Sequence, residues 1–322
     1  MKTLLKKKIW KMSLLIMLFV ILIEFSFFLP SYLNYKHYSV HTLLQAVQGM
    51  IPKSSSDKPK KAQPVPVKKY AIYHGDQTSA SFNDATEAIL FAKKLSYPSS
   101  VVLSANNRIL WSTVKPQSKA NAVTLINAPY ISQLPDLRTG CEVTTLAMLL
   151  QYSGYQVNKL ELAKKIDKDP TPLTYDSNKN MWWGNPHKGY VGEMLDGTKP
   201  SFGVFNKPIE GLARKYAGDR VINLTGMDFS DVLNVVRNGN PVWVIVTTTF
   251  SYDDTHNIDW MTADGPIHTT RNEHSVLLTG VDDKYVYMND PLDPDGKNRK
   301  RLTRPFQESW EQMGKQAITI LK

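Results

Sequence analysis

The chain has 322 residues, of which 42% are hydrophobic, so it is long enough for one large domain or two smaller ones and is not a disordered chain. Residues 1–69 hold 12 lysines and two acidic residues, whereas the remainder holds 27 basic and 27 acidic residues. The whole net charge of +10 therefore lies in the N-terminal part, and nucleic-acid binding by the folded part has little support. The single cysteine excludes an internal disulfide.

The N-terminus has the pattern of an export segment. Five lysines within the first eleven residues precede an apolar stretch from about Ser13 to Leu29, which Glu24 interrupts and Pro30 closes. Lysines before an apolar run predict a cytoplasmic N-terminus and an exported remainder. Bulky residues at the end of the stretch argue against cleavage, but the stretch is short for a membrane span. We therefore expect residues 1–30 to be a signal-anchor or a signal peptide, with the rest extracellular, either bound to the cell membrane or secreted.

Residues 31–69 are expected to form a basic linker. The part from 51 to 69 is rich in proline, lysine and serine, which is typical of an extended spacer. Its lysines could also contact anionic cell-wall polymers or lipid headgroups, although a solvated spacer accounts for the same composition.

Residues 70–118 are predicted to form a small βαββ module. The expected elements are a strand at Tyr70–Tyr73, a helix beginning at Asn83 or Asp84, and strands at Ser100–Leu103 and Ile109–Ser112. The module carries no catalytic constellation, so we interpret it as a spacer or adaptor.

Residues 121–322 show helical patterns first and strand patterns later, which predicts an α+β domain. The expected helices begin near Cys141, Asn158, Pro208 and Asp228, and the expected strands are Val242–Thr247, Ser275–Val281 and Tyr285–Asn289. Residues 178–193 and 251–272 are expected to be loops, the first rich in glycine and aromatic residues and the second polar.

Cys141 stands where a helix is predicted to begin. Thr139 and Glu142, three residues apart before an apolar run, have the spacing of a capping box with Thr139 as the N-cap. Cys141 would then be the second helical residue, where the helix dipole favours a thiolate and lowers the thiol pKa. The alternative is a small buried core residue, because free cysteines are usually buried.

A thiolate nucleophile requires a base and an orienting group, and His274 and Asp290 offer both. They flank a predicted hairpin. If the hairpin is centred on Asp282, His274 faces Asp290. If it is centred between residues 282 and 283, Asp290 faces Ser275 instead. The pairing therefore needs an odd loop or a bulge. The alternative for Asp290, which precedes Pro291, is a turn residue that ends the strand.

Gln133, eight residues before the cysteine, could supply a side-chain amide to an oxyanion hole together with the backbone N–H of Cys141. A loop glutamine on the surface is the alternative. Other histidines compete for the role of base, namely His187, His256 and His268. A metal site built from His268, His274 and Asp290 lacks any tight ligand spacing, so we expect neither a metal nor a cofactor.

Several motifs occur in an order that resembles the stand-alone C39-like peptidases, papain-like cysteine peptidases of bacterial cell surfaces. They are Gln133, Thr139–Leu146, Trp183–Pro186, Gly189–Gly192, Gly239–Val242, His274–Gly280 and Tyr287–Pro291. The resemblance covers residues 121–322 and implies Cys141 as nucleophile, His274 as base, Asp290 as orienting residue and Gln133 as oxyanion donor. Glu142 stands where transporter-linked members have glycine, so cleavage of double-glycine leaders does not carry over. Tyr190 stands where phenylalanine is expected.

The sequence thus predicts an extracytoplasmic cysteine peptidase that acts on peptides or proteins through Cys141, His274 and Asp290. An amidase or transpeptidase acting on cell-wall peptides could use the same triad. A non-catalytic cell-surface binding protein that retains the fold is the rival from another class.

Overall fold

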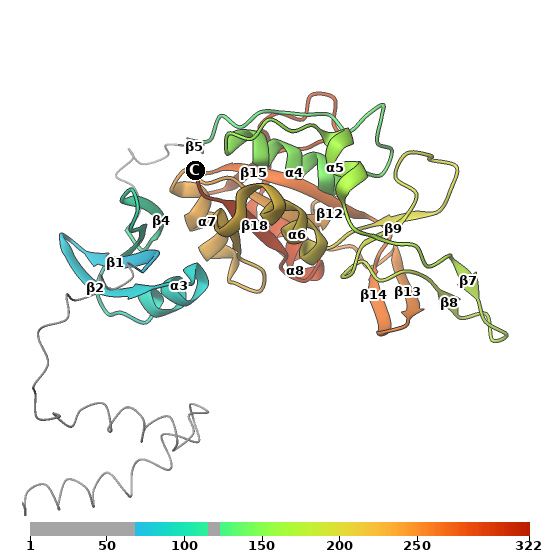
Figure 1. Cartoon of the computed structure of the whole chain (residues 1–322), viewed down its shortest axis with the longest axis horizontal. Helices are drawn as coiled ribbons and strands as arrows, with labels where there is room; N and C mark the ends of the chain where they lie inside the picture. The colour runs from blue at the N-terminus through green and yellow to red at the C-terminus, as the bar shows by residue number, and fades with distance from the viewer. Residues whose placement is uncertain (1–67, 115–122) are drawn as a thin grey trace, which may run out of the picture. The chain divides into compact units, whose positions relative to one another are not determined.

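The computed structural model describes residues 68–114 and 123–322 (Figure 1). The predicted signal segment, residues 1–30, and the predicted linker up to residue 67 lie outside the described residues. Within the described ranges, no helix combines the length and apolar character needed to cross a bilayer.

The first described unit of structure is a four-stranded antiparallel sheet with strand order β2-β1-β3-β4 and one helix, α3. Its elements are β1 (Tyr70–His74), β2 (Gln77–Phe82), α3 (Ala85–Lys93), β3 (Ser100–Leu103) and β4 (Arg108–Ser112). Asp84 caps α3 by accepting a hydrogen bond from the Glu87 N–H, as its sequence position predicts. Strand β2 was not predicted, because this edge strand is polar and mostly exposed and so lacks an apolar pattern.

Asp231 joins this unit to the following domain. Its carboxylate is 2% exposed, accepts a hydrogen bond from Trp111 Nε1 at 3.1 Å and pairs with Lys93 Nζ at 2.6 Å. Lys93 also pairs with Asp228, whose side chain is 68% exposed. The same lysine therefore contacts one buried and one exposed carboxylate.

We expect Asp231→Ala to lower the free energy of unfolding by about 2–4 kcal/mol, because it leaves the Trp111 N–H and the Lys93 ammonium without their buried partner. Asp228→Ala is the matched control and should cost less than about 1 kcal/mol, as exposed pairs do. Urea unfolding followed by tryptophan fluorescence measures both. Equal effects of the two substitutions would contradict this account.

The centre of the main domain is a seven-stranded sheet with strand order β11-β18-β12-β15-β16-β17, in which β5 also pairs with β15. Its strands are β5 (Thr124–Leu125), β11 (Val221–Asn223), β12 (Val242–Thr247), β15 (Glu273–Val281), β16 (Tyr285–Asn289), β17 (Arg299–Leu302) and β18 (Ala317–Ile320). All residues of β12 and β15 are buried, so both faces of the sheet are covered there.

Helices cover the two faces of this sheet. One hydrophobic core contains side chains of α4 (Cys141–Tyr152), α5 (Lys159–Lys165) and α6 (Asn206–Ala217) together with Ile245 and Leu277. The other contains side chains of α7 (Phe229–Arg237) and α8 (Thr303–Gln312) together with Val244 and Val276. Alternate residues of each strand therefore face different cores, as the period of two in a strand requires. Figure 1 shows α4 running alongside β15.

Two small sheets complete the domain. One has strand order β10-β9-β6, and the other, order β14-β13-β8-β7, projects from one end (Figure 1). Their strands are β6 (Lys168–Asp169), β7 (Thr174–Tyr175), β8 (Met181–Trp182), β9 (Tyr190–Gly192), β10 (Ser201–Gly203), β13 (Asn257–Thr262) and β14 (Gly265–Thr270). The prediction of a loop over 251–272 was therefore wrong for the hairpin β13–β14.

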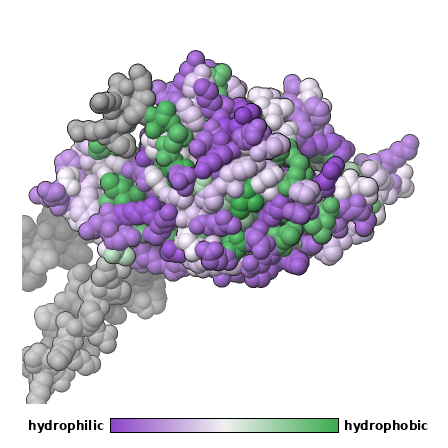
Figure 2. Space-filling view, turned by 90° about the horizontal axis from the view of Figure 1, so that it is seen from above, coloured by the Kyte–Doolittle hydropathy of each residue, from purple (hydrophilic) through white to green (hydrophobic). Residues whose placement is uncertain are grey.

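The fold is mixed α/β, and its main sheet is antiparallel throughout, as the expected α+β class requires. On the face shown in Figure 2, the hydrophobic residues lie in separate patches among hydrophilic ones.

Candidate active site

Cys141 is the first residue of α4, and Gly140, not Thr139, is its N-cap. The capping box predicted from the sequence was wrong. The Thr139 hydroxyl instead donates a hydrogen bond to the Glu193 carbonyl at 3.2 Å, and the Tyr190 hydroxyl donates to the Thr139 carbonyl at 2.6 Å. Cys141 nevertheless lies at the positive end of the helix, where the first backbone N–H groups have no helical partner.

The expectation of a low thiol pKa was also wrong in the structure as it stands. Burial raises the pKa of Cys141 well above its usual value, and the nearby carboxyls of Glu142 and Glu273 raise it further. A hydrogen bond from the backbone N–H of Ser275 lowers this pKa, but by less. The thiol donates to Glu142 Oε2 at 3.4 Å, and among the described residues it has no hydrogen bond to His274. The site therefore holds Cys141 as a thiol, because burial and negative charge outweigh the helix dipole.

Glu142 turns inward instead of capping its helix. It is fully buried, and its Oε1 accepts a hydrogen bond from the Val204 N–H at 2.7 Å. Burial raises its pKa to about 7, although the hydrogen bonds from backbone N–H groups and from the thiol lower it. Because the pKa in the folded state exceeds that of an unfolded glutamate, Glu142 contributes most to stability below about pH 4.5, and that contribution is lost as the pH rises through about 7.

His274 and Asp290 form a buried pair. His274 Nε2 lies 2.8 Å from Asp290 Oδ1, and the two side chains are 3% and 7% exposed. Burial alone would raise the pKa of Asp290, but the hydrogen bond and charge of His274 and the N–H groups of Leu292 and Asp293 lower it overall. An ionised carboxylate can only accept, so Nε2 donates to Asp290 and Nδ1 is left as the acceptor.

Neither hairpin register considered for this pair is the one observed. Leu277 lies opposite Asn289 and Leu278 opposite Met288, and the register shifts between Leu278 and Gly280. Asp290 follows the end of β16, so its side chain reaches His274 from beyond the ladder and not from a directly opposed position. A bulge was one of the two irregularities that the predicted pairing needed, and this shift in register is such an irregularity.

Gln133 lies beside the segment that carries Asp290. Its backbone N–H donates to the Pro291 carbonyl at 2.8 Å, and the side chain is buried. Its Nε2 donates to the Arg138 carbonyl at 3.1 Å, and its Oε1 has no hydrogen-bond partner among the described residues. The structure thus brings Gln133 to Asp290, and Asp290 to His274, with the amide of Gln133 directed at the loop before Cys141.

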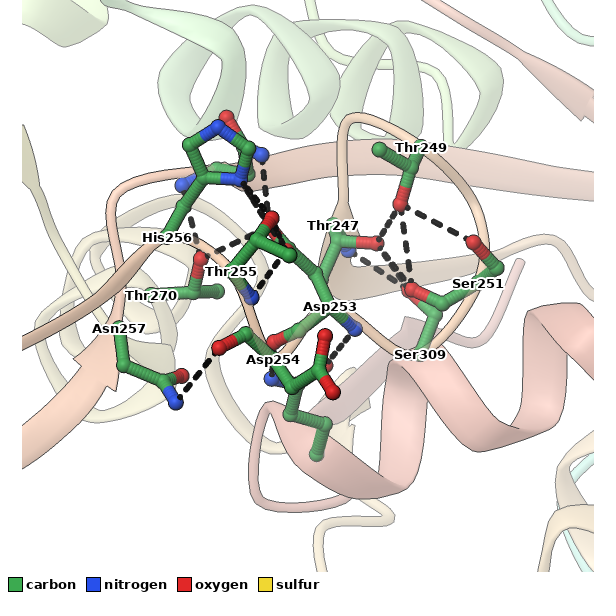
Figure 3. Close-up of polar contacts among 12 residues, drawn as sticks. Thr247, Thr249, Ser251, Asp253, Asp254, Thr255, His256, Asn257, Thr270 and Ser309 are labelled. Carbon is green, nitrogen blue, oxygen red and sulfur yellow. Dashed lines mark hydrogen bonds and ion pairs between the residues drawn. The ribbon is translucent and has the colours of Figure 1, made fainter.

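The competing histidines lie in other surroundings. His256 Nδ1 lies 3.1 Å from each oxygen of Asp253, within the polar network that precedes β13 (Figure 3). His268 pairs with Asp259, and both side chains are at least 70% exposed. His187 packs edge-on against Phe205. Because His268 is on the surface and His274 is buried, the metal set of His268, His274 and Asp290 has no structural basis.

One set of possible metal donors exists among the described residues. Cys141 Sγ and one oxygen each of Glu142 and Glu273 lie within 4.8 Å of one another. Burial raises the pKa of all three groups, whereas a metal needs ionised ligands, and Glu142 already accepts two hydrogen bonds. This set is better suited to hold protons than a cation.

A cysteine at a helix start and a buried histidine–carboxylate pair are the groups that cysteine hydrolases use. Residues 125–318 match the Peptidase_C39 like family. The uncharacterized protein YvpB of Bacillus subtilis (strain 168) is 48% identical over 188 residues, which are 58% of this chain and 71% of YvpB. A crystal structure from Bacillus anthracis, described as a C39-like peptidase, has a TM-score of 0.58 and 37% identity, and the match covers 63% of this chain and 98% of that one.

The chain therefore belongs to the Peptidase_C39 like family, and the resemblance stated from its motifs is confirmed. No role was predicted for Glu273, and Glu142 was predicted to cap its helix. An acidic residue directly beside Cys141 and another beside His274, in otherwise apolar elements, were the signal that could have revealed them.

Proposed function

We propose that the chain is a cysteine peptidase in which Cys141 is the nucleophile, His274 the general base and Asp290 the orienting residue. The observation that carries this proposal is the buried pair formed by His274, on the strand β15 that packs against α4, and Asp290, which follows β16. The backbone N–H of Ser275, the residue after His274, lowers the pKa of the Cys141 thiol by hydrogen bonding. The helix that carries the nucleophile and the strand that carries the base therefore meet at this point.

In the proposed reaction, the thiol turns from Glu142 towards His274, and Nδ1 takes its proton. The thiolate attacks the substrate carbonyl carbon, and the imidazolium then donates a proton to the departing amine. Water, activated by the same histidine, hydrolyses the thioester. Asp290 stays ionised and holds the imidazole with Nδ1 facing the reacting groups.

The oxyanion needs donors fixed in advance. The backbone N–H of Cys141 at the start of α4 is one, and the Nε2 of Gln133 is the other in this proposal. In the structure that amide is held by the Arg138 carbonyl, three residues before the cysteine. Gln133 therefore has to exchange this carbonyl for the oxyanion during catalysis.

Digestion of a diverse peptide library with the purified chain, read by mass spectrometry, tests the proposal. New N-termini that appear with the wild type and not with Cys141→Ala support a peptidase. Ligated products or release of ammonia without new peptide N-termini would show transpeptidase or amidase chemistry instead. No product of any kind would leave the chain as a binding protein with this fold.

We also propose that the catalytic domain lies outside the cytoplasm and is attached to the cell membrane through residues 1–30. The support is the run of lysines before an apolar stretch. Protease added to intact cells is expected to remove the domain, cutting in the Pro/Lys/Ser-rich segment 51–69. A cytoplasmic protein in the same cells is the control and should survive. Digestion of the domain only after lysis would refute this topology.

A further inference from the structure

Two buried carboxyl groups from different elements meet beside the nucleophile. Glu142 belongs to the first turn of α4, and Glu273 is the first residue of β15. Glu142 is 0% and Glu273 9% exposed. The proposed base, His274, follows Glu273 directly, so each glutamate is the chain neighbour of a proposed catalytic residue.

One oxygen of Glu142 and one of Glu273 lie within 4.8 Å of each other, and Gly203, at the end of β10, lies against both carboxyls. A Cβ built on this residue would lie 2.4 Å from Glu142 Oε1 and 2.9 Å from Glu273 Oε2. Both groups therefore converge on one glycine, whose φ of +138° also disfavours any other residue. A side chain at this position would displace the pair.

No cation offsets the charge of this pair among the described residues. Within residues 68–114 and 123–322, the Glu142 carboxylate accepts hydrogen bonds from the Val204 N–H and the Cys141 thiol alone, and Glu273 Oε1 has no partner. The other groups facing the pair are the Ser275 N–H, which acts on the thiol, and Tyr190, whose pKa is raised by burial and by Glu142. His274 is committed to Asp290.

Two carboxylates cannot both stay ionised at such a place, because each must lose its hydration and repel the other. Burial, and then the charge of Glu142, raise the pKa of Glu273 well above its usual value. Burial raises that of Glu142 to about 7. A proton held by one of the two carboxyls removes most of this cost, as in other closely spaced carboxyl pairs.

We propose that Glu142 and Glu273 share one proton and act as positioning residues that hold Cys141 as a thiol. Within the pair, Glu273 holds the proton and the negative charge stays on Glu142, which accepts the thiol hydrogen bond. The thiol remains un-ionised until it turns to His274. This inference rests on the proposed role of Cys141 as the nucleophile, but it concerns the thiol alone and needs no substrate to test.

The test is a thiol titration of the full-length chain, followed by the ultraviolet absorbance of the thiolate. Cys141 is the only cysteine, so subtracting the signal of Cys141→Ser isolates it. Glu142→Gln should lower the thiol pKa by roughly one unit or more, because it removes the charge nearest to sulfur. Glu273→Gln should lower it much less, because the charge of the pair stays mainly on Glu142. Glu311→Gln, an exposed glutamate on α8, is the matched control and should leave the titration unchanged.

Equal lowering by Glu142→Gln and Glu273→Gln would overturn the proposal, since it means that both carboxyls are ionised. An unchanged thiol pKa in Glu142→Gln would overturn it as well. Should that variant fail to fold by circular dichroism, infrared spectroscopy of the wild type decides: a protonated carboxyl band at neutral pH that Glu273→Gln removes supports the shared proton, and its absence refutes it. A shifted titration together with no hydrolysis would retain the pair and reject the proposed peptidase function.

Discussion

Replacing Cys141 with alanine is expected to abolish hydrolysis, with a loss on the order of 10⁴-fold or more in kcat/KM, because no acyl-enzyme can form without the sulfur. The measurement is steady-state kinetics on a peptide that the wild type cleaves. The fold should persist, since the substitution leaves the helix backbone and the Glu142–Val204 hydrogen bond in place. Circular dichroism and urea unfolding check that condition.

Ser153→Ala, beyond the other end of the same helix, is the control for this experiment. The Ser153 hydroxyl is buried and donates to the Leu149 carbonyl at 2.9 Å, so its loss perturbs α4 by a comparable amount far from the thiol. We expect this variant to keep the wild-type rate. If Cys141→Ala also kept it, the cysteine mechanism would be excluded, whatever the fold.

Several elements of the fold could be predicted from patterns of neighbouring residues. The buried strand Val242–Thr247 has the predicted bounds, because an unbroken apolar run between turn residues has few other interpretations. The α5 N-cap at Asn158, which accepts from the Glu161 N–H, also follows from local spacing. Both features depend on neighbouring residues alone.

The hairpin β13–β14 was missed although its pattern was present. In β13 the exposed Asn257 and Asp259 alternate with the buried Ile258, Trp260 and Thr262. Polar residues on the outer face led to the interpretation as a loop. The inner face of the hairpin packs against Trp183 and Phe202, which are distant in sequence. The apolar partners that stabilise this hairpin could therefore not be predicted from its own residues.

The electrostatics of the candidate site depend on contacts between residues that are distant in sequence, and local patterns do not contain them. The motifs pointed to Cys141, His274, Asp290 and Gln133. The structure pairs His274 with Asp290 and holds Gln133 against the Pro291 and Arg138 carbonyls, while the catalytic roles of the four residues stay a prediction. The raised pKa of the thiol could not be predicted, because it depends on Glu273 arriving from another strand and on complete burial. Helix position alone suggested the opposite direction.

Substitutions at the histidine–carboxylate pair should rank the two groups by their roles. His274→Ala is expected to lower kcat at least about 10²-fold, because it removes the proposed group that takes the thiol proton and returns it to the departing amine. Asp290→Asn keeps an amide oxygen that can accept the Nε2 hydrogen bond, so it should retain more activity than Asp290→Ala. The expected order of activity is wild type, Asp290→Asn, Asp290→Ala and His274→Ala.

The loss in Asp290→Ala has two physical parts. The imidazole loses the partner that fixes Nδ1 towards the reacting groups, and the imidazolium formed during the reaction loses the negative charge 2.8 Å away. Because His274 is 3% exposed, water does not readily replace that charge. Asp290→Asn restores the first part and not the second, which is why we expect its activity to be intermediate.

His268→Ala and Asp264→Ala are the controls, since both change groups in the sheet β7–β8–β13–β14 and neither touches the pair. They should keep activity within about threefold of the wild type, because exposed surface pairs contribute little. Kinetics on all five variants, with folding checked by circular dichroism, decides between the two regions. If Asp290→Ala behaved as the wild type while one of these controls were inactive, the base would belong to β13 and β14, and the buried contact between His274 and Asp290 would have only a structural role.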